Sequence, residues 1–116
     1  MSKKGIIRNG YFYSFKERKA KEPSKGIKVR SVYLENLMIT HMEFEPGSII
    51  PEHRHSNEQI TLILEGKMDM TVGKEIKTAV KGDIIVIPAN IEHSAKILDE
   101  FTVAVDGWSP VRDDYK

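Results

Sequence analysis

Cysteine is absent from this chain of 116 residues. The absence excludes disulfides, thiolate metal ligands and cysteine nucleophiles, and it fits a reducing compartment. No stretch approaches the roughly 18 consecutive apolar residues that a membrane span requires. The charged start, Met1 to Lys4, is not followed by an apolar run of signal-peptide length. We therefore expect a cytoplasmic protein that makes no membrane contact.

An excess of charge of either sign is also missing, since 18 basic and 17 acidic residues leave a net charge of +1. Nucleic-acid binding normally requires a clear basic excess, so the composition predicts no nucleic-acid partner. Apolar residues make up 40% of the chain and charged residues 30%, which is typical of globular proteins. At this length we expect a single domain covering residues 1–116.

Sustained helical periodicity is lacking, and short apolar or alternating segments separated by turn residues take its place. These segments are residues 27–34, 37–44, 59–64, 68–72, 75–80, 84–87, 94–98 and 101–105. The pattern predicts an all-β sandwich or barrel over residues 27–108. We expect an irregular arm at residues 1–26 and a polar tail that crosses the surface at residues 109–116.

Three of the four histidines fall into two short segments. Residues i and i+2 of an extended strand point to the same face, so His53 and His55 place two imidazoles side by side. In the second segment Pro88 ends an apolar strand, and Asn90 can adopt the positive φ that turns His93 back toward the core. Imidazole is a ligand for Zn, Cu, Fe and Ni. The alternatives are two surface histidines and one structural histidine.

Taken together, the two segments resemble the paired motifs of the cupin superfamily. The first motif is a glycine, a His-x-His pair, an acidic position and a second glycine at fixed intervals. It is matched here by Gly47, His53, His55, Gln59 and Gly66, with Gln59 at the acidic position. The second motif is matched by Gly82, Pro88 and His93, with Asn90 replacing a glycine and Ile97 replacing an asparagine.

The cupin resemblance implies a double-stranded β-helix, that is, a jelly-roll barrel with a metal in its mouth. Cupins of this kind are often homodimers, so the resemblance also implies a homodimer. The implied ligands of one divalent metal are His53, His55, Gln59 and His93. Their neutrality would leave the metal its full 2+ charge, which attracts an anionic substrate. Ni, Zn, Fe and Mn all remain open as the metal.

Glu58 is the alternative to Gln59 as the fourth ligand. Gln59 and Thr61 share one face of the strand, and Glu58 shares the other face with Ile60, Leu62 and Leu64. The motif's interval to its second glycine favours Gln59, and Thr61 would then line a polar substrate pocket. The apolar face would need another cover, which could be an outer sheet, a partner subunit or residues 1–26.

The closing segment, from Asp106 to Asp113, resembles the ending of the pectin-degradation (KdgF-type) cupins. These proteins linearise the unsaturated uronates that pectate and alginate lyases release. The chain departs from their pattern with Trp108 where phenylalanine is common and Thr61 where a second glutamine is frequent. The resemblance implies a metal-dependent enzyme that opens 4,5-unsaturated uronates, with a small anionic sugar as substrate.

Under this hypothesis Asp106 transfers protons, Arg112 binds the substrate carboxylate, Trp108 stacks on the sugar, and His41 lines the pocket. Each residue also has a structural alternative. Asp106 could cap a turn, Arg112 could pair with a neighbouring aspartate, and Trp108 and His41 could simply pack. Two other functions stay open. One is another cupin metalloenzyme, such as a dioxygenase, isomerase or lyase, and the other is a non-catalytic protein that binds a sugar or another small ligand, or acts as a sensor.

Overall fold

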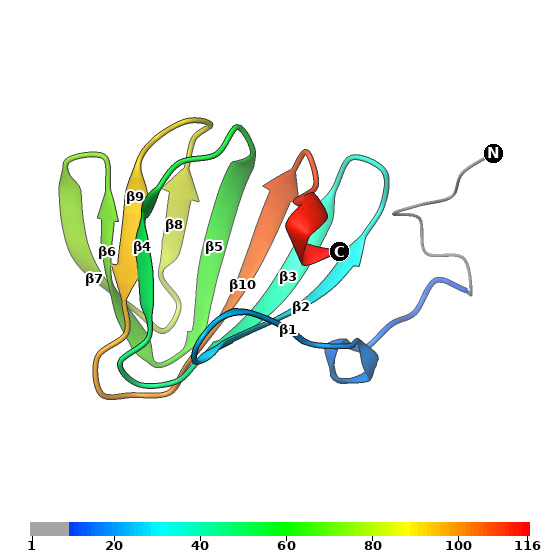
Figure 1. Ribbon diagram of the computed structural model, residues 1–116, viewed down its shortest axis with the longest axis horizontal. Helices are drawn as coiled ribbons and strands as arrows, with labels where there is room; N and C mark the ends of the chain where they lie inside the picture. Colours follow the sequence, from blue (N-terminus) through cyan, green and yellow to red (C-terminus); the bar gives the residue numbers. More distant parts are fainter. Residues whose placement is uncertain (1–9) are drawn as a thin grey trace.

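The structure, a computed structural model, describes residues 10–116, and its regular secondary structure is almost entirely β-strand (Figure 1). In chain order the elements are η1 (Phe15–Glu17), β1 (Lys21–Ser24), β2 (Ile27–Tyr33), β3 (Met38–Phe44), β4 (Ile49–His53), β5 (Glu58–Glu65), β6 (Lys67–Val72), β7 (Glu75–Val80), β8 (Ile84–Ile87), β9 (His93–Lys96), β10 (Thr102–Ser109) and η2 (Asp113–Tyr115). Both η elements are short 3-10 helices. Within residues 10–116, no helix has the length and apolar character needed to cross a membrane.

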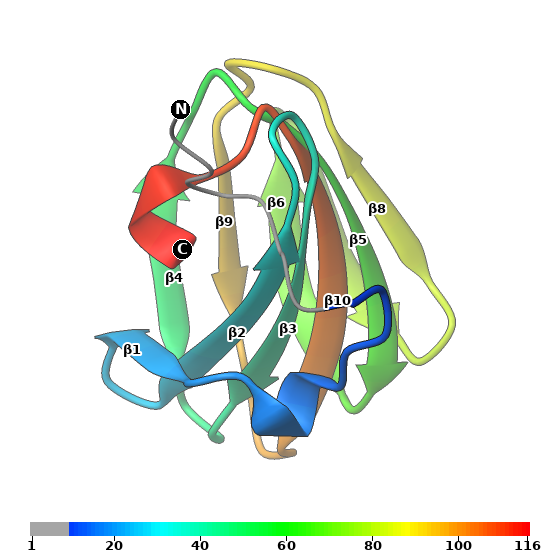
Figure 2. The ribbon, with the colours of Figure 1, turned by 90° about the vertical axis from the view of Figure 1, so that its right-hand side faces the viewer.

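The strands form two antiparallel sheets that face each other across the core (Figures 1 and 2). One sheet has the order β1-β2-β3-β10-β5-β8, and the other has the order β4-β9-β6-β7. The chain repeatedly crosses between them, so β3 and β4 lie in different sheets although they are consecutive. This arrangement is the jelly-roll, double-stranded β-helix barrel that the sequence predicted.

Alternation along each strand decides which side chains form the core, because successive residues point to opposite faces of a sheet. On β3, for example, Met38, Thr40, Met42 and Phe44 are buried, and the residues between them are not. The core cluster consists of Ile27, Val29, Met42, Phe44, Ile63, Met68, Met70, Ala79, Ile87, Ala95, Ile97 and Ala104. Both sheets contribute to this cluster, which holds them together through buried apolar surface.

The barrel extends beyond the predicted range at both ends. β1 lies within the predicted arm and pairs with β2, whereas residues 1–9 of that arm lie outside the described part of the chain. β10 continues through Ser109, four residues past the predicted strand end at Val105. The predicted surface tail returns to the barrel as η2, and its Tyr115 packs against the core cluster. Strand pairing of β1 and packing of Tyr115 therefore bring parts of the predicted arm and of the predicted tail onto the barrel.

Candidate metal centre

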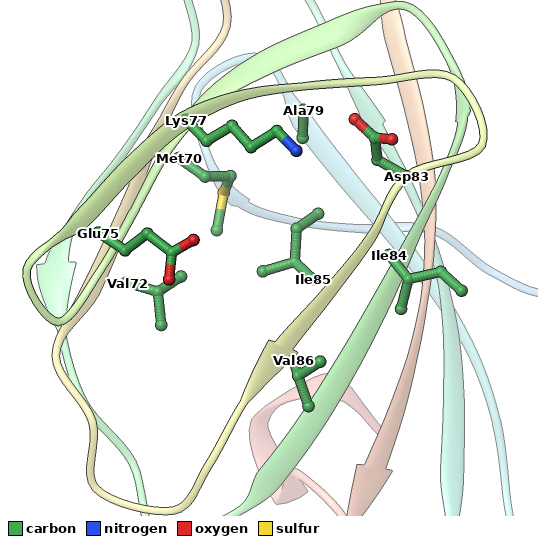
Figure 3. Close-up of a pocket in the computed structure, with 9 residues that line it drawn as sticks. All are labelled: Met70, Val72, Glu75, Lys77, Ala79, Asp83, Ile84, Ile85 and Val86. Carbon is green, nitrogen blue, oxygen red and sulfur yellow. The ribbon is translucent and has the colours of Figure 1, made fainter.

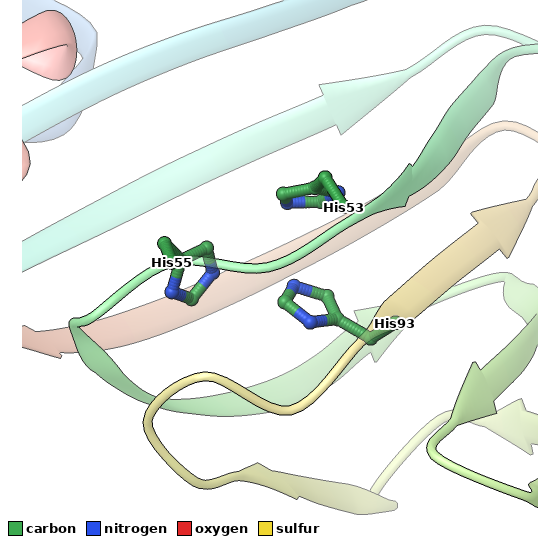
Figure 4. A group of neighbouring side chains, drawn as sticks. All are labelled: His53, His55 and His93. Carbon is green, nitrogen blue, oxygen red and sulfur yellow. The ribbon is translucent and has the colours of Figure 1, made fainter.

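Three imidazoles converge at one end of the barrel (Figure 4). The ring centroids of His53 and His93 are 4.3 Å apart, those of His55 and His93 are 4.8 Å apart, and those of His53 and His55 are 5.4 Å apart. One potential ligand atom from each ring lies within 4.8 Å of the others. The spacing therefore allows the three side chains to bind a common ion.

Pairing between β4 and β9 brings the two distant segments together. His53 ends β4 and is the register partner of His93, the first residue of β9. His55 follows in the loop beyond β4, and the Asn90 N–H donates a hydrogen bond of 2.8 Å to its carbonyl oxygen. Asn90 has a φ of 65°, which confirms the predicted left-handed turn. The turn directs His93 inward, where it is buried.

Each imidazole is oriented by a backbone carbonyl near its Nδ1 atom. Nδ1 lies 2.9 Å from the Pro51 oxygen in His53, 3.1 Å from the Asn57 oxygen in His55 and 2.9 Å from the Ile91 oxygen in His93. A carbonyl only accepts hydrogen bonds, so Nδ1 must carry the proton in each ring. The Nε2 atom of each neutral ring is then left with the lone pair that a metal requires.

Burial favours the neutral form of the inner rings. Desolvation lowers the pKa of His55 and of His93 below the ordinary histidine value, although the hydrogen bonds to Asn57 and Ile91 oppose that effect. The charge of Arg112 also lowers both pKa values. Near neutral pH these two rings are therefore held in the form that coordinates metals.

Gln59 supplies a fourth potential ligand atom, an amide oxygen, next to the three imidazoles. It faces the barrel interior, whereas Glu58 is exposed on the opposite face of β5, as strand parity predicted. The Gln59 Oε1 atom lies 3.2 Å from Nε2 of His55. Because both atoms carry lone pairs in this tautomer, they repel each other unless a cation lies between them. The donor set of three Nε2 atoms and one amide oxygen therefore fits a divalent metal.

His53 and His93 border a cavity of about 50 Å³ inside the barrel. Its lining combines apolar core side chains with a polar group consisting of His53, Gln59, Thr61, His93, Ser94 and Asp106. The aromatic side chains of Trp108 and Tyr115 complete the wall. Such a mixture of an apolar wall and a few convergent polar groups is typical of small-molecule sites.

Asp106 lies in the middle of β10, between register partners Thr40 on β3 and Thr61 on β5. It is therefore not the turn cap that the sequence left as an alternative. Its carboxylate accepts hydrogen bonds from both threonine hydroxyls and from Gln59. Burial raises the pKa of Asp106 above the ordinary aspartate value, and these three hydrogen bonds oppose the rise.

The guanidinium of Arg112 is held at the edge of this site. It donates two hydrogen bonds, of 3.0 and 2.7 Å, to the carboxylate of Asp114. Its Cζ atom lies 5.1 Å from the Trp108 ring centroid and 4.4 Å from that of Tyr115. The buried Nη1 atom has no hydrogen-bond partner within residues 10–116. Arg112 thus makes the aspartate pair that the sequence left as its structural alternative, and its Nη1 donor is still unused.

His41 lies away from this group. It points to the outer face of β3 and packs against Phe15, with ring centroids 5.3 Å apart. The inward positions on either side of it are Thr40 and Met42. The structure therefore does not bring His41 to the pocket and favours its role as a packed strand histidine. The alternation of β3 contained the signal, since it places His41 on the face opposite Thr40.

Two site residues were not predicted from the sequence. Thr40 contacts Asp106 from β3, and strand alternation could have identified it as an inward polar residue. Tyr115 reaches the site from η2, and the Ser31 hydroxyl donates a hydrogen bond of 2.7 Å to its carbonyl oxygen. Nothing in the polar sequence around Tyr115 indicated that the tail would fold back onto the barrel.

A second hollow, of about 370 Å³, lies on the flank of the barrel where β7 and β8 form the edges of the two sheets (Figure 3). Its lining residues are Met70, Val72, Glu75, Lys77, Ala79, Asp83, Ile84, Ile85 and Val86. No histidine lines it, and the Asp83 carboxylate already accepts a hydrogen bond of 2.9 Å from the Val80 N–H. We therefore place the candidate chemistry at the three imidazoles.

Comparison with known proteins yields related sequences and structures. The family description "Cupin domain" matches residues 40–105. The pectin degradation protein KdgF of Dickeya dadantii is 28% identical over 96 residues, which is 81% of this chain and 87% of that protein. The structure of KdgF from Halomonas sp. is similar with a TM-score of 0.83 and 27% identity, covering 91% of this chain and 98% of that one. An RmlC-like cupin from Shewanella frigidimarina is 23% identical and has a TM-score of 0.86, covering 93% of this chain and 97% of that one. At this level of identity it supports the fold alone.

Proposed function

Because this chain belongs to the cupin domain family, we propose that it is a metal-dependent enzyme that opens 4,5-unsaturated uronate sugars to their keto form. The observation that carries the proposal is the convergence of three imidazoles and the Gln59 oxygen beside Asp106 and Arg112. The similarity to a pectin degradation protein directs the choice of substrate toward sugar acids derived from pectin. The metal would be Ni, Zn, Fe or Mn.

The reaction is an isomerisation that needs no oxidant or reductant. The substrate is a cyclic hemiacetal with a carbon–carbon double bond next to its carboxylate. The anomeric hydroxyl loses a proton, the bond from the anomeric carbon to the ring oxygen breaks, and an aldehyde and an enol result. The enol becomes a ketone when C4 gains a proton and the enol oxygen loses one. Acid–base catalysis and stabilisation of a developing negative oxygen are therefore sufficient.

The residues of the site divide these tasks. A metal held by the imidazoles and Gln59 would supply a Lewis acid for the oxygen that gains negative charge. Arg112 would bind the substrate carboxylate through Nη1, which has no partner in the described chain. Asp106, as part of the cavity wall, would carry the proton between the anomeric oxygen and C4. Trp108 would pack against the sugar face, and Thr61 would contact its hydroxyls.

The direct assay uses unsaturated monouronates freshly prepared with a pectate or alginate lyase. Protein loaded separately with Ni, Zn, Fe or Mn is expected to remove the ultraviolet absorbance of the conjugated enol ether, and chelation should stop the loss. The aldehyde and ketone products are identified by NMR. Absence of turnover with all four metals would contradict the proposal. Saturable uronate binding in that case would favour the non-catalytic alternative, and oxygen consumption with other substrates would favour a dioxygenase.

We also propose that the protein is a homodimer. The outer surface of the larger sheet carries six aliphatic side chains that are between 37% and 63% exposed. They form the outer aliphatic face, which consists of Ile39, Ile60, Leu62, Leu64, Ile84 and Val86. Direct register pairs join Ile60 to Val86 and Leu62 to Ile84, so the face is continuous across β5 and β8.

A second copy of the chain is the partner that this face fits best. The six side chains expose roughly 500 Å², a large part of the roughly 800 Å² that each partner contributes to a standard interface. None of the six side chains is charged, so two identical faces can pack without charge complementarity across a twofold axis.

Replacing Leu62 by lysine is expected to convert the dimer to a monomer, because the new charge would be desolvated at the centre of the interface. Sedimentation velocity measures the mass, and circular dichroism checks that the barrel is folded. The matched control is Ile76→Lys, at a 75% exposed isoleucine of β7 outside the face, which should leave the dimer intact. A wild-type protein that stays monomeric into the sub-millimolar range would contradict the dimer.

A further inference from the structure

Buried side chains behind the imidazoles form a series of hydrogen bonds in which the donor and acceptor of each bond are fixed. It begins at Trp108, whose indole Nε1 donates a hydrogen bond of 2.9 Å to the Thr40 hydroxyl oxygen. An indole N–H can only donate, so this end of the chain cannot reverse. Trp108 is 3% exposed and Thr40 is 0% exposed, which leaves water no access to either group. The Thr40 oxygen is therefore fixed as an acceptor from the indole.

The next hydrogen bond in the chain runs from the Thr40 hydroxyl, as donor, to the Asp106 carboxylate, as acceptor. Because its oxygen accepts from the indole, the Thr40 hydroxyl is free to donate its own hydrogen, and Asp106 Oδ2 lies 2.9 Å away. Asp106 Oδ1 accepts from the Thr61 hydroxyl and from Gln59 Nε2, the latter at 3.3 Å. All of the contacts on this carboxylate, which is 2% exposed, therefore come from donors.

The same direction orients the carboxamide of Gln59. Its Nε2 atom donates to Asp106 and, at 2.9 Å, to the Thr61 hydroxyl oxygen. Its Oε1 atom then faces Nε2 of His55 at 3.2 Å. Rotating the amide by half a turn would place its oxygen against the Asp106 carboxylate and its N–H group at the imidazoles. That orientation brings two acceptors together and removes the oxygen from the metal position.

We propose that Trp108, Thr40 and Asp106 are positioning residues that keep the Gln59 oxygen directed toward the metal position. This inference rests on the metal site of the proposed function, but it concerns a different property, which is the orientation of one ligand. A side chain that holds a ligand in its coordinating orientation acts through metal affinity. The proposal therefore makes a statement about binding that does not depend on the identity of the sugar.

The test compares Thr40→Val, which keeps the shape and removes the hydroxyl, with Thr40→Ser, which restores it. Affinity for Zn and for Ni is measured by competition with a chromophoric chelator. Thr40→Val is expected to weaken binding about tenfold, within the 10- to 100-fold range typical of groups that orient metal ligands. Thr40→Ser should stay within about twofold of wild type. Asp106→Asn should weaken binding by about tenfold or more, since an amide cannot accept from all three donors.

A second readout detects the amide directly. In metal-free protein labelled with nitrogen-15, the two carboxamide protons of Gln59 should be shifted and exchange slowly, because both are hydrogen bonded to Thr61 and Asp106. Thr40→Val and Trp108→Phe should reduce that protection. The matched control is Thr71→Val on β6, which removes a hydroxyl elsewhere and should change neither readout.

The two measurements separate this proposal from the proposed function. Unchanged metal affinity in folded Thr40→Val and Asp106→Asn proteins would overturn the positioning role, whatever the enzyme does to uronates. Rapidly exchanging Gln59 amide protons in the wild-type protein would overturn it as well. Reduced affinity with rescue by Thr40→Ser supports it even if no uronate is consumed, in which case only the proposed reaction fails.

Discussion

The double variant His53→Ala/His55→Ala is expected to bind no divalent metal and still fold into the same barrel. It removes two of the three imidazoles, so one nitrogen and one amide oxygen remain, too few for a stable site. The fold should persist because the core cluster lies between the sheets and contains neither histidine. Isothermal titration with Zn and Ni measures the binding, and circular dichroism with a thermal melt measures the fold.

The control for this variant is His41→Ala. His41 lies on the outer face of β3 against Phe15, so its removal should leave metal binding unchanged. If the double variant failed to fold, or if the wild-type barrel collapsed on chelation, the metal would be structural. That result would contradict the proposal that the metal has open coordination positions for substrate.

Replacing Arg112 by glutamine is expected to lower kcat/KM for the unsaturated uronate by roughly 10²-fold while metal occupancy stays intact. The guanidinium is the only cationic group that the described structure places against Trp108 and Tyr115 with a free buried donor. Loss of a desolvated, charge-assisted contact costs about 2 to 4 kcal/mol, which corresponds to roughly 30- to 1,000-fold. Initial rates with metal-loaded protein give the comparison.

Arg30→Gln is the matched control for that experiment. Arg30 also pairs with a carboxylate, Glu43 at 2.8 Å, but lies on the strand face opposite the cavity. The Arg30→Gln substitution should therefore leave kcat/KM within about twofold of the wild-type value. An Arg112→Gln enzyme with unchanged kcat/KM would show that another group binds the substrate carboxylate. An equal loss of metal would instead assign Arg112 to the integrity of the site.

Local sequence patterns predicted how the side chains point within each of the two segments of the candidate metal centre, because these directions follow from short-range rules. The two-residue spacing places His53 and His55 together, and the left-handed turn at Asn90 returns His93 to them. Strand parity alone separates Gln59 from Glu58, because adjacent residues must face opposite sides of β5. The meeting of the two segments required the cupin resemblance, since β4 and β9 are about 40 residues apart.

The residues behind the metal centre could not be predicted in the same way. Thr40, Asp106 and Trp108 meet because β3 and β10 pair in one particular register, and a sequence read alone does not specify that register. Tyr115 reaches the cavity only because the polar tail folds back as η2. His41 lies on the face of β3 opposite Thr40, which favours the packed strand histidine that the sequence left as its alternative.

Anomalous diffraction from crystals loaded with Ni or Zn, collected at the absorption edge of that metal, tests the metal centre most directly. We expect one peak about 2.0 to 2.2 Å from Nε2 of His53, His55 and His93, with the Gln59 oxygen as fourth protein ligand and a coordination position open to the cavity. A loaded crystal without a peak among the three imidazoles would contradict the proposed centre. So would a peak coordinated by Glu58 with Gln59 turned outward.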